Sequence, residues 1–335
     1  MKLDTLLLAN GRDAVDQARV MAAAGIDGVF TFEGPFDPFV PLTMTAAATD
    51  LDVYTNIALA FVRSPMSFAY LAWDLHRLSG GRFMLGLGTQ VRANVEDRYG
   101  MQYSKPVARM RETIEALHAI FDRWQNGTPL DFRGEFTRHT LMQPTFDPGP
   151  LEWGPPPVML GALGPQMTRL AGRLADGVLV HPVMTPRYLE ESTVPNLDAG
   201  TARAGRTVGD LIVVCDVIVA TGRDEAEMEM ALAGVRGLLS FYLSTPSYAA
   251  PLVPYGWEGL QPELNQLSKA GRWDEMSALI DDEILHTLAV VGEPAEIAAK
   301  VRERFSALDP DRVGFYLPYL APPDLVAETA LSFKG

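Results

Sequence analysis

Short apolar segments alternate with longer amphipathic segments along nearly the whole chain, and this alternation constrains the fold more than any other feature. Each short segment has the length and character of a strand, and each is followed by a segment with the length of a helix. Such alternation is typical of parallel strands joined by crossover helices. The expected strands cover residues 3–8, 28–32, 53–61, 83–87, 158–161, 177–181, 211–220 and 312–317.

Eight strand–helix units in 335 residues predict an α/β fold, a (β/α)8 TIM barrel with insertions after strand 4 and strand 7. A doubly wound parallel sheet is the alternative. No linker divides the chain, so we expect a single domain over residues 1–335, with insertions at about residues 89–157 and 241–290. The first insertion should hold a hairpin turning at Gly134-Glu135, and the second should be irregular from residue 245 to about 273. Helices are expected over residues 13–24, 40–48, 67–78, 105–126, 166–174, 186–204, 224–244, 294–308 and 323–333.

The charge balance argues against two classes of partner. The chain carries 28 Lys and Arg against 42 Asp and Glu, a formal net charge of −14, whereas nucleic acids and anionic membranes are bound by basic surfaces. The single cysteine, Cys215, rules out an internal disulfide and lies in an apolar run, which predicts a buried thiol. The sequence shows neither a membrane-spanning stretch nor a signal-peptide pattern, so we expect a cytoplasmic location.

Glycines cluster where two of the expected strands end. Gly86 and Gly88 lie at the end of the fourth strand, and residues 161–164 follow the fifth. Because barrel enzymes bind ligands at the carboxyl ends of their strands, we expect backbone here to approach a flat or phosphorylated ligand. A dinucleotide fingerprint is disfavoured, since Val91 replaces its third glycine. Pro165 predicts a helix start whose free N–H groups favour an anion, with a plain strand-to-helix turn as the alternative.

Two polar residues end other strands. Glu33 ends the second strand and is either a site residue or a solvated loop residue; His181 ends the sixth and is either a ligand contact or a structural rim histidine. No His, Cys, Asp and Glu residues have metal-ligand spacing, so no metal is expected, and neither a nucleophile elbow nor a P-loop is present. These absences favour chemistry carried by an organic cofactor.

Six motifs together resemble the luciferase-like monooxygenase superfamily and, within it, the coenzyme F420-dependent oxidoreductases. They follow one another in the family's order over nearly the whole chain. The resemblance implies a (β/α)8 barrel, usually dimeric, that binds FMN or the deazaflavin coenzyme F420 at its carboxyl rim. The matching motifs are AGIDGV at 24–29, LHRLSGGRF at 75–83, LGLGT at 85–89, GALGP at 161–165, AGRLADG at 171–177 and AVVGEP at 289–294.

The resemblance also implies roles for individual residues. In relatives a carboxylate at the end of the second strand lies near the cofactor ring, which makes Glu33 the expected catalytic residue. A non-proline cis peptide bond behind the ring is implied within residues 56–58, and the loop at 161–164 matches the one that holds the cofactor phosphate. The expected cofactor-binding residues are Asn56, Ile57, Ala58, Thr89, Asn94, Gly161, Ala162, Leu163, Gly164 and His181.

We therefore expect an F420-dependent oxidoreductase, a homodimer that transfers a hydride between deazaflavin and a small, apolar organic substrate. Sugar-phosphate-oxidising relatives carry a histidine after the carboxylate and a glutamate near position 91, where this chain has Gly34 and Val91, which argues against that substrate. The alternatives are an FMN-dependent monooxygenase using reduced flavin and O2, and a non-catalytic flavin-binding barrel. Aromatic residues either line an apolar pocket or form a dimer core; they are Phe36, Phe39, Phe61, Phe241, Tyr242, Tyr255 and Trp257.

Overall fold

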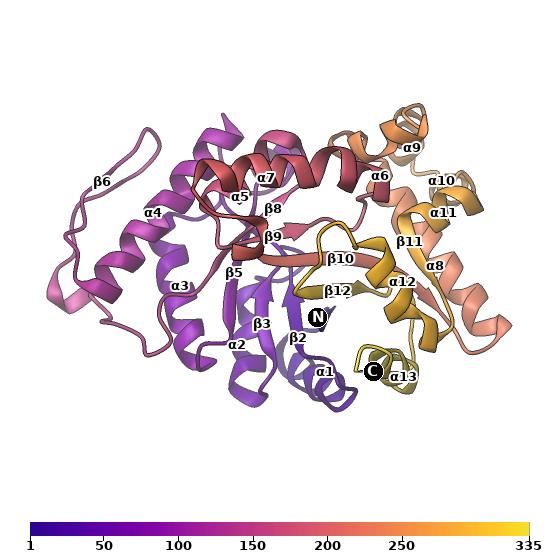
Figure 1. The fold of residues 1–335 in the computed structure, drawn as a ribbon, viewed down its shortest axis with the longest axis horizontal. Helices are drawn as coiled ribbons and strands as arrows, with labels where there is room; N and C mark the ends of the chain where they lie inside the picture. Colours follow the sequence, from indigo (N-terminus) through magenta and orange to yellow (C-terminus); the bar gives the residue numbers. More distant parts are fainter. Residues whose placement is uncertain (335) are drawn as a thin grey trace.

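The computed structural model describes residues 1–334, and in it eight parallel strands close into a barrel (Figure 1). Strand β1 pairs with β2 and with β12, while the first half of β10 pairs with β9 and completes the ring. The closed ring confirms the predicted (β/α)8 barrel and excludes the open, doubly wound sheet. The barrel strands are β1 Lys2–Leu6, β2 Gly28–Thr31, β3 Asp52–Thr55, β5 Phe83–Gly88, β8 Val158–Ala162, β9 Gly177–Val180, β10 Ile212–Thr221 and β12 Arg312–Tyr316.

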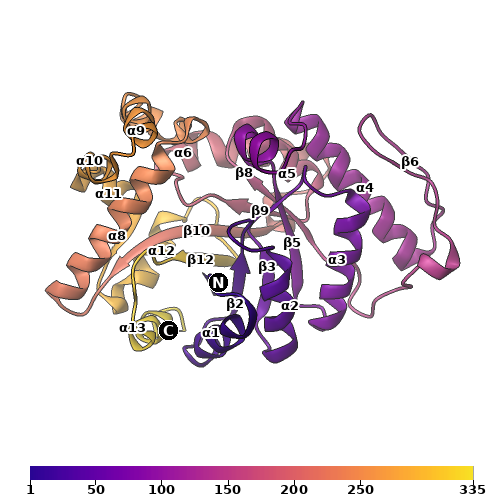
Figure 2. The ribbon, with the colours of Figure 1, turned by 180° about the vertical axis from the view of Figure 1, so that it is seen from behind.

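The helices cover the outside of the barrel, and α1 to α4 follow one another around it (Figure 2). Two of the helices begin with a capping side chain: Ser64 caps α3 by accepting from the N–H of Ser67, and Asp224 caps α8 by accepting from that of Glu227. The predicted helices are present with shifted ends. They are α1 Gly11–Ala23, α2 Phe39–Ala48, α3 Pro65–Leu78, α4 Pro106–Asn126, α5 Pro165–Leu174, α6 Pro186–Tyr188, α7 Val194–Arg203, α8 Glu225–Leu243, α12 Ile297–Arg304 and α13 Pro323–Leu331.

The second insertion is more regular than the sequence predicts. Helices α9 Leu260–Lys269, α10 Trp273–Ala278 and α11 Asp282–Leu288 form there, and β11 Ala289–Gly292 pairs with the end of β10. The three helices are short, and buried residues such as Leu264 pack them against the barrel's own helix α8. Contacts with the core stabilise helices this short. The expectation of an irregular stretch from 245 to 273 was wrong over α9.

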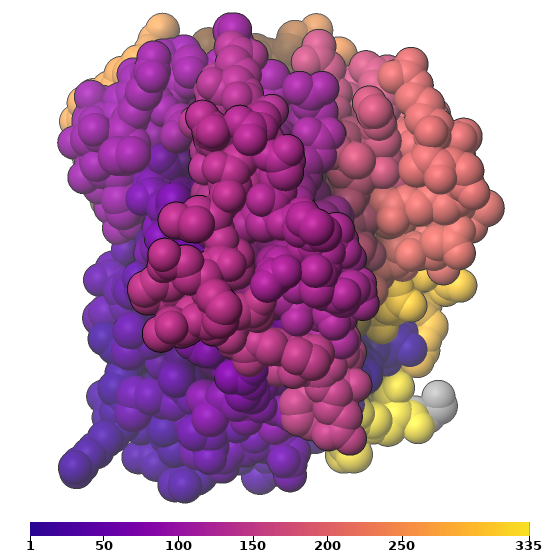
Figure 3. All heavy atoms as spheres, turned by 90° about the vertical axis from the view of Figure 1, so that its left-hand side faces the viewer, coloured from indigo at the N-terminus to yellow at the C-terminus, as the bar shows by residue number. Residues whose placement is uncertain are grey.

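The first insertion carries the predicted hairpin, in which β6 Phe132–Arg133 pairs antiparallel with β7 Arg138–His139. It projects beside α4 (Figure 1), and the space-filling view shows this magenta segment lying over the outside of the molecule (Figure 3). The buried carboxylate of Glu112, on α4, accepts from the backbone N–H groups of residues 135–137 at 2.5 to 2.7 Å. One side chain therefore holds the hairpin turn.

We expect Glu112→Gln to destabilise the protein by about 1–3 kcal/mol, because the new amide group turns one acceptor oxygen into a donor that faces backbone donors. Urea unfolding measures this change, and hydrogen exchange at residues 135–137 should accelerate. Glu115→Gln is the matched control, since Glu115 lies on the same helix, is more exposed and is only 4.0 Å from Arg111. Equal stability of the two variants would show that the hairpin does not depend on Glu112.

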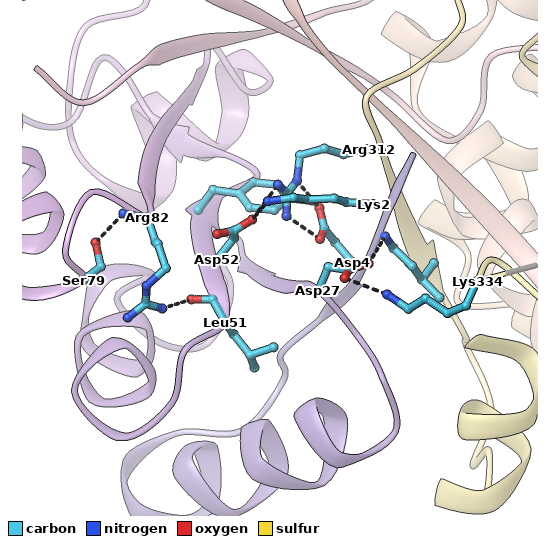
Figure 4. A network of polar contacts seen from close by, with 11 residues as sticks. Lys2, Asp4, Asp27, Leu51, Asp52, Ser79, Arg82, Arg312 and Lys334 are labelled. Atoms are coloured by element: carbon cyan, nitrogen blue, oxygen red, sulfur yellow. Dashed lines mark hydrogen bonds and ion pairs between the residues drawn. The ribbon is translucent and has the colours of Figure 1, made fainter. Parts of the chain in front are cut away.

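A buried ion-pair network joins three strands at the end of the barrel opposite the glycine loops (Figure 4). Arg312 on β12 donates twice to Asp4 on β1 and once to Asp52 on β3, each bond being 2.7 Å long. The hydroxyl of Tyr54 donates to Asp4 at 3.0 Å, and Lys2 pairs with Asp52 from the surface. Charges buried in this way need their partners, which makes the network a stability determinant.

Candidate active site

The candidate site is built on the segment that follows β3, where the chain bulges before the short strand β4 Ala58–Leu59. The Asn56–Ile57 peptide bond is cis, as the family resemblance implies. The side chain of Ile57 packs between two of the predicted glycine positions: a Cβ on Gly88 would lie 2.3 Å from it, and one on Gly161 would lie 3.1 Å from it. The bulge therefore meets the ends of β5 and β8 at one rim.

These close contacts explain why glycine occupies these positions, which the sequence alone did not show. A Cβ on Gly86 would lie 1.9 Å from the carbonyl oxygen of Thr55, so this glycine lets two strands approach each other. Gly88 and Gly161 make room for the side chain of Ile57. Gly164 differs, since a Cβ there would meet no atom within 4 Å. Within this set, Gly164 is the position with open space beside its backbone.

Glu33, which follows β2, holds the bulge through hydrogen bonds. Its N–H donates to the carbonyl of Ile57 at 3.2 Å, and its carboxylate accepts from the N–H of Leu59 at 3.1 Å. Arg63 donates to both carboxylate oxygens at 2.8 Å, and the Tyr99 hydroxyl adds a fourth bond at 3.1 Å. Glu33 is 5% exposed and surrounded by donors. Glu33 is therefore a buried carboxylate held by four donors and not a solvated loop residue.

The charge of Arg63 is shared between two carboxylates. Burial acts to lower its pKa, but the hydrogen bonds and charges of Glu33 and Asp37 raise the pKa of Arg63 overall. Burial and the nearby Glu33 carboxylate raise the pKa of Tyr99, which keeps this hydroxyl a donor at neutral pH. Neither Arg63 nor Tyr99 was among the residues expected at the site. Their sequence distances of 30 and 66 residues from Glu33 explain why.

Asp216 holds the same bulge from inside the barrel. The side-chain amide of Asn56 donates to both of its carboxylate oxygens, at 2.9 and 2.7 Å. Asp216 lies in the middle of β10, and Gly314 on the neighbouring strand leaves room for it, because a Cβ there would be 2.3 Å away. Burial raises the pKa of Asp216 well above its ordinary value. Asp216 was not among the residues expected at the site; an acidic residue within the apolar run 211–220 is the signal that could have found it.

The loop after β8 leads directly into α5. Ala162 is buried at the strand end, Leu163 packs against the core, and Gly164 is the N-cap residue, with φ −86° and no capping side chain. Pro165 occupies the first turn, as expected. The first N–H groups of the helix have no acceptor within it and are available to an anion.

Thr89 and Asn94 lie beyond the end of β5 and are half-buried. Asn94 begins a π-helical segment, Asn94–Arg98, and Arg98 donates to the carbonyl oxygen of Gly34 beside Glu33. Within residues 1–334 the side chains of Thr89 and Asn94 make no hydrogen bond to the residues that surround the bulge. The structure thus brings the π-helical segment to the site and leaves the two polar side chains without a partner there.

His181 follows β9 and contacts two tyrosines from the second insertion region. Its ring centroid lies 5.3 Å from that of Tyr242 and 4.5 Å from that of Tyr248. Burial lowers the pKa of His181 to about 3, so the ring is neutral at physiological pH. The aromatic residues expected to line a pocket or a dimer core do not form one group: Phe39 and Phe61 are core residues, whereas Phe36 and Phe241 are exposed.

Across residues 1–334, no three His, Cys, Asp or Glu side chains come together in an arrangement that would hold a metal ion. No helix in that range combines the length and the apolar character that crossing a bilayer demands.

The chain matches the family model described as luciferase-like monooxygenase over residues 3–310. An uncharacterized protein of Mycobacterium tuberculosis is 46% identical over 305 residues, which cover 91% of this chain and 90% of the relative. A second protein of that organism, whose name places it among the coenzyme F420-dependent oxidoreductases, is 30% identical over 83% of this chain and 84% of its own.

The fold is also that of a solved enzyme. The coenzyme F420-dependent tetrahydromethanopterin reductase from Methanopyrus kandleri superposes with a TM-score of 0.81, covering 98% of this chain and 96% of the reductase. Its sequence identity is 19%, so the superposition shows likeness of fold and no more.

Proposed function

The chain belongs to the luciferase-like monooxygenase family, and from this premise we propose that it is an F420-dependent oxidoreductase that transfers a hydride between the deazaflavin and an organic substrate. The relatives named for F420 support the cofactor, and membership of the family makes the protein an oxidoreductase. The observation that carries the proposal is the bulge at Asn56–Ile57, held from one side by Glu33 and from the other by Asp216.

The residues at the rim fit a flat ring joined to an anionic tail. Ile57 forms an apolar surface at the ends of β5 and β8, which suits a ring face, and α5 begins with free N–H groups, which suit a phosphate. In this proposal residues 56–58 support the ring and residues 161–164 hold the phosphate, with Thr89 and Asn94 as further polar contacts. When bound, a deazaflavin supplies hydride transfer.

The chain's own contribution is orientation. Glu33 and Asp216 fix the backbone of the bulge, so the support for the ring is set before the cofactor arrives. Arg63 and Leu59 surround the Glu33 carboxylate with donors. A proton relay through Glu33 would require at least one of these bonds to break, so we propose that Glu33 orients the ring.

Replacing Gly164 with valine is expected to lower cofactor affinity at least tenfold, about 1.4 kcal/mol, because a branched side chain would fill the space beside the phosphate-binding amides. Its φ of −86° and the open space suit valine, so the melting temperature should change little. Gly259→Val is the matched control: Gly259 is also the N-cap residue of a ten-residue helix and also has open space. Fluorescence titration of a folded variant with wild-type affinity would refute the phosphate site.

Turnover distinguishes the proposed reaction from the FMN-dependent monooxygenase that the family name allows. Purified protein is mixed with reduced F420 and a panel of carbonyl compounds, imines and activated alkenes without oxygen, and in parallel with reduced FMN, the same panel and O2. The proposal predicts substrate-dependent oxidation of the deazaflavin in the first mixture. Substrate-dependent O2 consumption in the second alone would establish the monooxygenase, and no reaction in either would favour the non-catalytic barrel.

A further inference from the structure

His181, Tyr242 and Tyr248 form a cluster that is separate from the bulge contacts but lies at the same rim. The two tyrosine rings are 6.2 Å apart and perpendicular, and both stand against the imidazole of His181. Tyr242 and Tyr248 pack against the same core cluster as Ile57. Burial and the Asp216 carboxylate, which holds Asn56, raise the pKa of Tyr242 and of Tyr316. Tyr242 is therefore within electrostatic range of the group that holds the bulge.

All three side chains are neutral donors. The N–H of Val183 donates to Nδ1 of His181 at 3.3 Å, so the neutral ring carries its proton on Nε2. Burial lowers the pKa of His181, and no charged group contributes to that shift. Burial raises the pKa of both Tyr242 and Tyr248, which leaves their hydroxyls protonated.

The donors are available to a ligand. Within residues 1–334, Nε2 of His181 and the hydroxyls of Tyr242 and Tyr248 have no hydrogen-bond acceptor, and none of the three atoms is sealed from solvent. Donors in a half-buried site need an acceptor, which a ligand oxygen can supply. None of the three side chains is charged, so an uncharged acceptor avoids the cost of taking an anion out of water.

We propose that His181, Tyr242 and Tyr248 form the substrate subsite and that they bind the uncharged oxygen of a carbonyl compound or of the corresponding alcohol. This inference rests on the proposed function, because it places the reacting carbon next to a hydride carrier, and it moves His181 from cofactor contact to substrate contact. We expect carboxylates and phosphates to bind more weakly at this end of the substrate. A site built to donate to an oxygen also rejects analogues that lack it.

The test uses protein labelled with ¹⁵N-histidine and saturated with F420, and it compares three probes of similar shape: cyclohexanone, methylenecyclohexane and cyclohexanecarboxylate. Cyclohexanone should shift the Nε2 resonance of His181, assigned with His181→Gln, while the other four histidines serve as internal references. It should bind at least tenfold more tightly than the other two probes. Tyr248→Phe should weaken cyclohexanone three- to tenfold, whereas Tyr255→Phe, whose ring stacks on Trp257, should not.

The inference is overturned if cyclohexanone leaves the His181 resonance unchanged, if the carboxylate binds as tightly, or if Tyr248→Phe behaves like Tyr255→Phe. Deazaflavin fluorescence is followed in the same samples, and the titration is repeated without cofactor. Absence of deazaflavin binding with a normal response of His181 to the ketone would contradict the proposed function and leave the subsite standing. Deazaflavin binding with no response of His181 to the ketone would contradict the substrate subsite and leave the proposed function standing.

Discussion

Replacing Arg312 with leucine is expected to lower the free energy of unfolding by about 3–5 kcal/mol, the cost of leaving a buried carboxylate without its partner. Asp4 is 0% exposed and the Arg312 side chain 7% exposed, and no other cation pairs with Asp4 in residues 1–334. In this variant Asp52 would still pair with Lys2, so Asp4 is the carboxylate that would be left without a cation. Denaturant unfolding with a constant m value measures the loss.

Two comparisons make this prediction specific. Lys2→Met removes a partly exposed ion pair to Asp52 and should cost less than about 1 kcal/mol. Combining Arg312→Leu with Asp4→Leu should recover much of the loss, because no unpaired charge remains and two apolar side chains can pack there. If the Arg312→Leu protein is as stable as the Lys2→Met protein, the network contributes little to the free energy of unfolding.

Glu33→Gln is expected to lower cofactor affinity at least tenfold and to slow turnover as well. Glutamine keeps the size of Glu33, but it presents an N–H group to the donors of Arg63 and Leu59, and hydrogen bonds to charged groups contribute about 1.5–3 kcal/mol each. The segment of residues 57–59 would then be held less firmly. Fluorescence titration measures the affinity without any knowledge of the substrate.

Asp37→Asn is the matched control for that variant, since Asp37 accepts from the same arginine at 2.7 Å but is half exposed. Its affinity should stay within a few-fold of wild type. A Glu33→Gln protein with unchanged affinity and turnover slowed a hundredfold would instead make Glu33 a proton relay. If affinity and turnover both match wild type, Glu33 has no role in the site.

The barrel was predictable because its strands and helices carry local signals. Strands buried on both faces read as apolar runs, and helix starts such as Ser64-Pro65 carry their own caps. The hairpin at residues 132–139 was marked by its glycine turn. Helices α9 and α10 have no capping side chain, and residues such as Leu264 are buried by contacts with α8 and the core.

The candidate site was predictable only in part, because local sequence does not state which distant residues meet. The strand-end position of Glu33 pointed to the site, but its partner Arg63 lies 30 residues away. Asn56 and Asp216 are separated by 160 residues. Gly86 and Gly88 indicated that another group comes close to the backbone of this strand. The sequence did not identify those groups, which are Thr55 and Ile57. The single-domain organisation, the homodimer and the cytoplasmic location stay predictions.

Titration of the purified protein with F420 and, separately, with FMN, each followed by fluorescence quenching, tests whether the rim binds a deazaflavin. We expect F420 to bind at least tenfold more tightly than FMN, and Gly164→Val to weaken the binding of F420 while Gly259→Val does not. Micromolar or tighter binding of FMN with no detectable binding of F420 would contradict it.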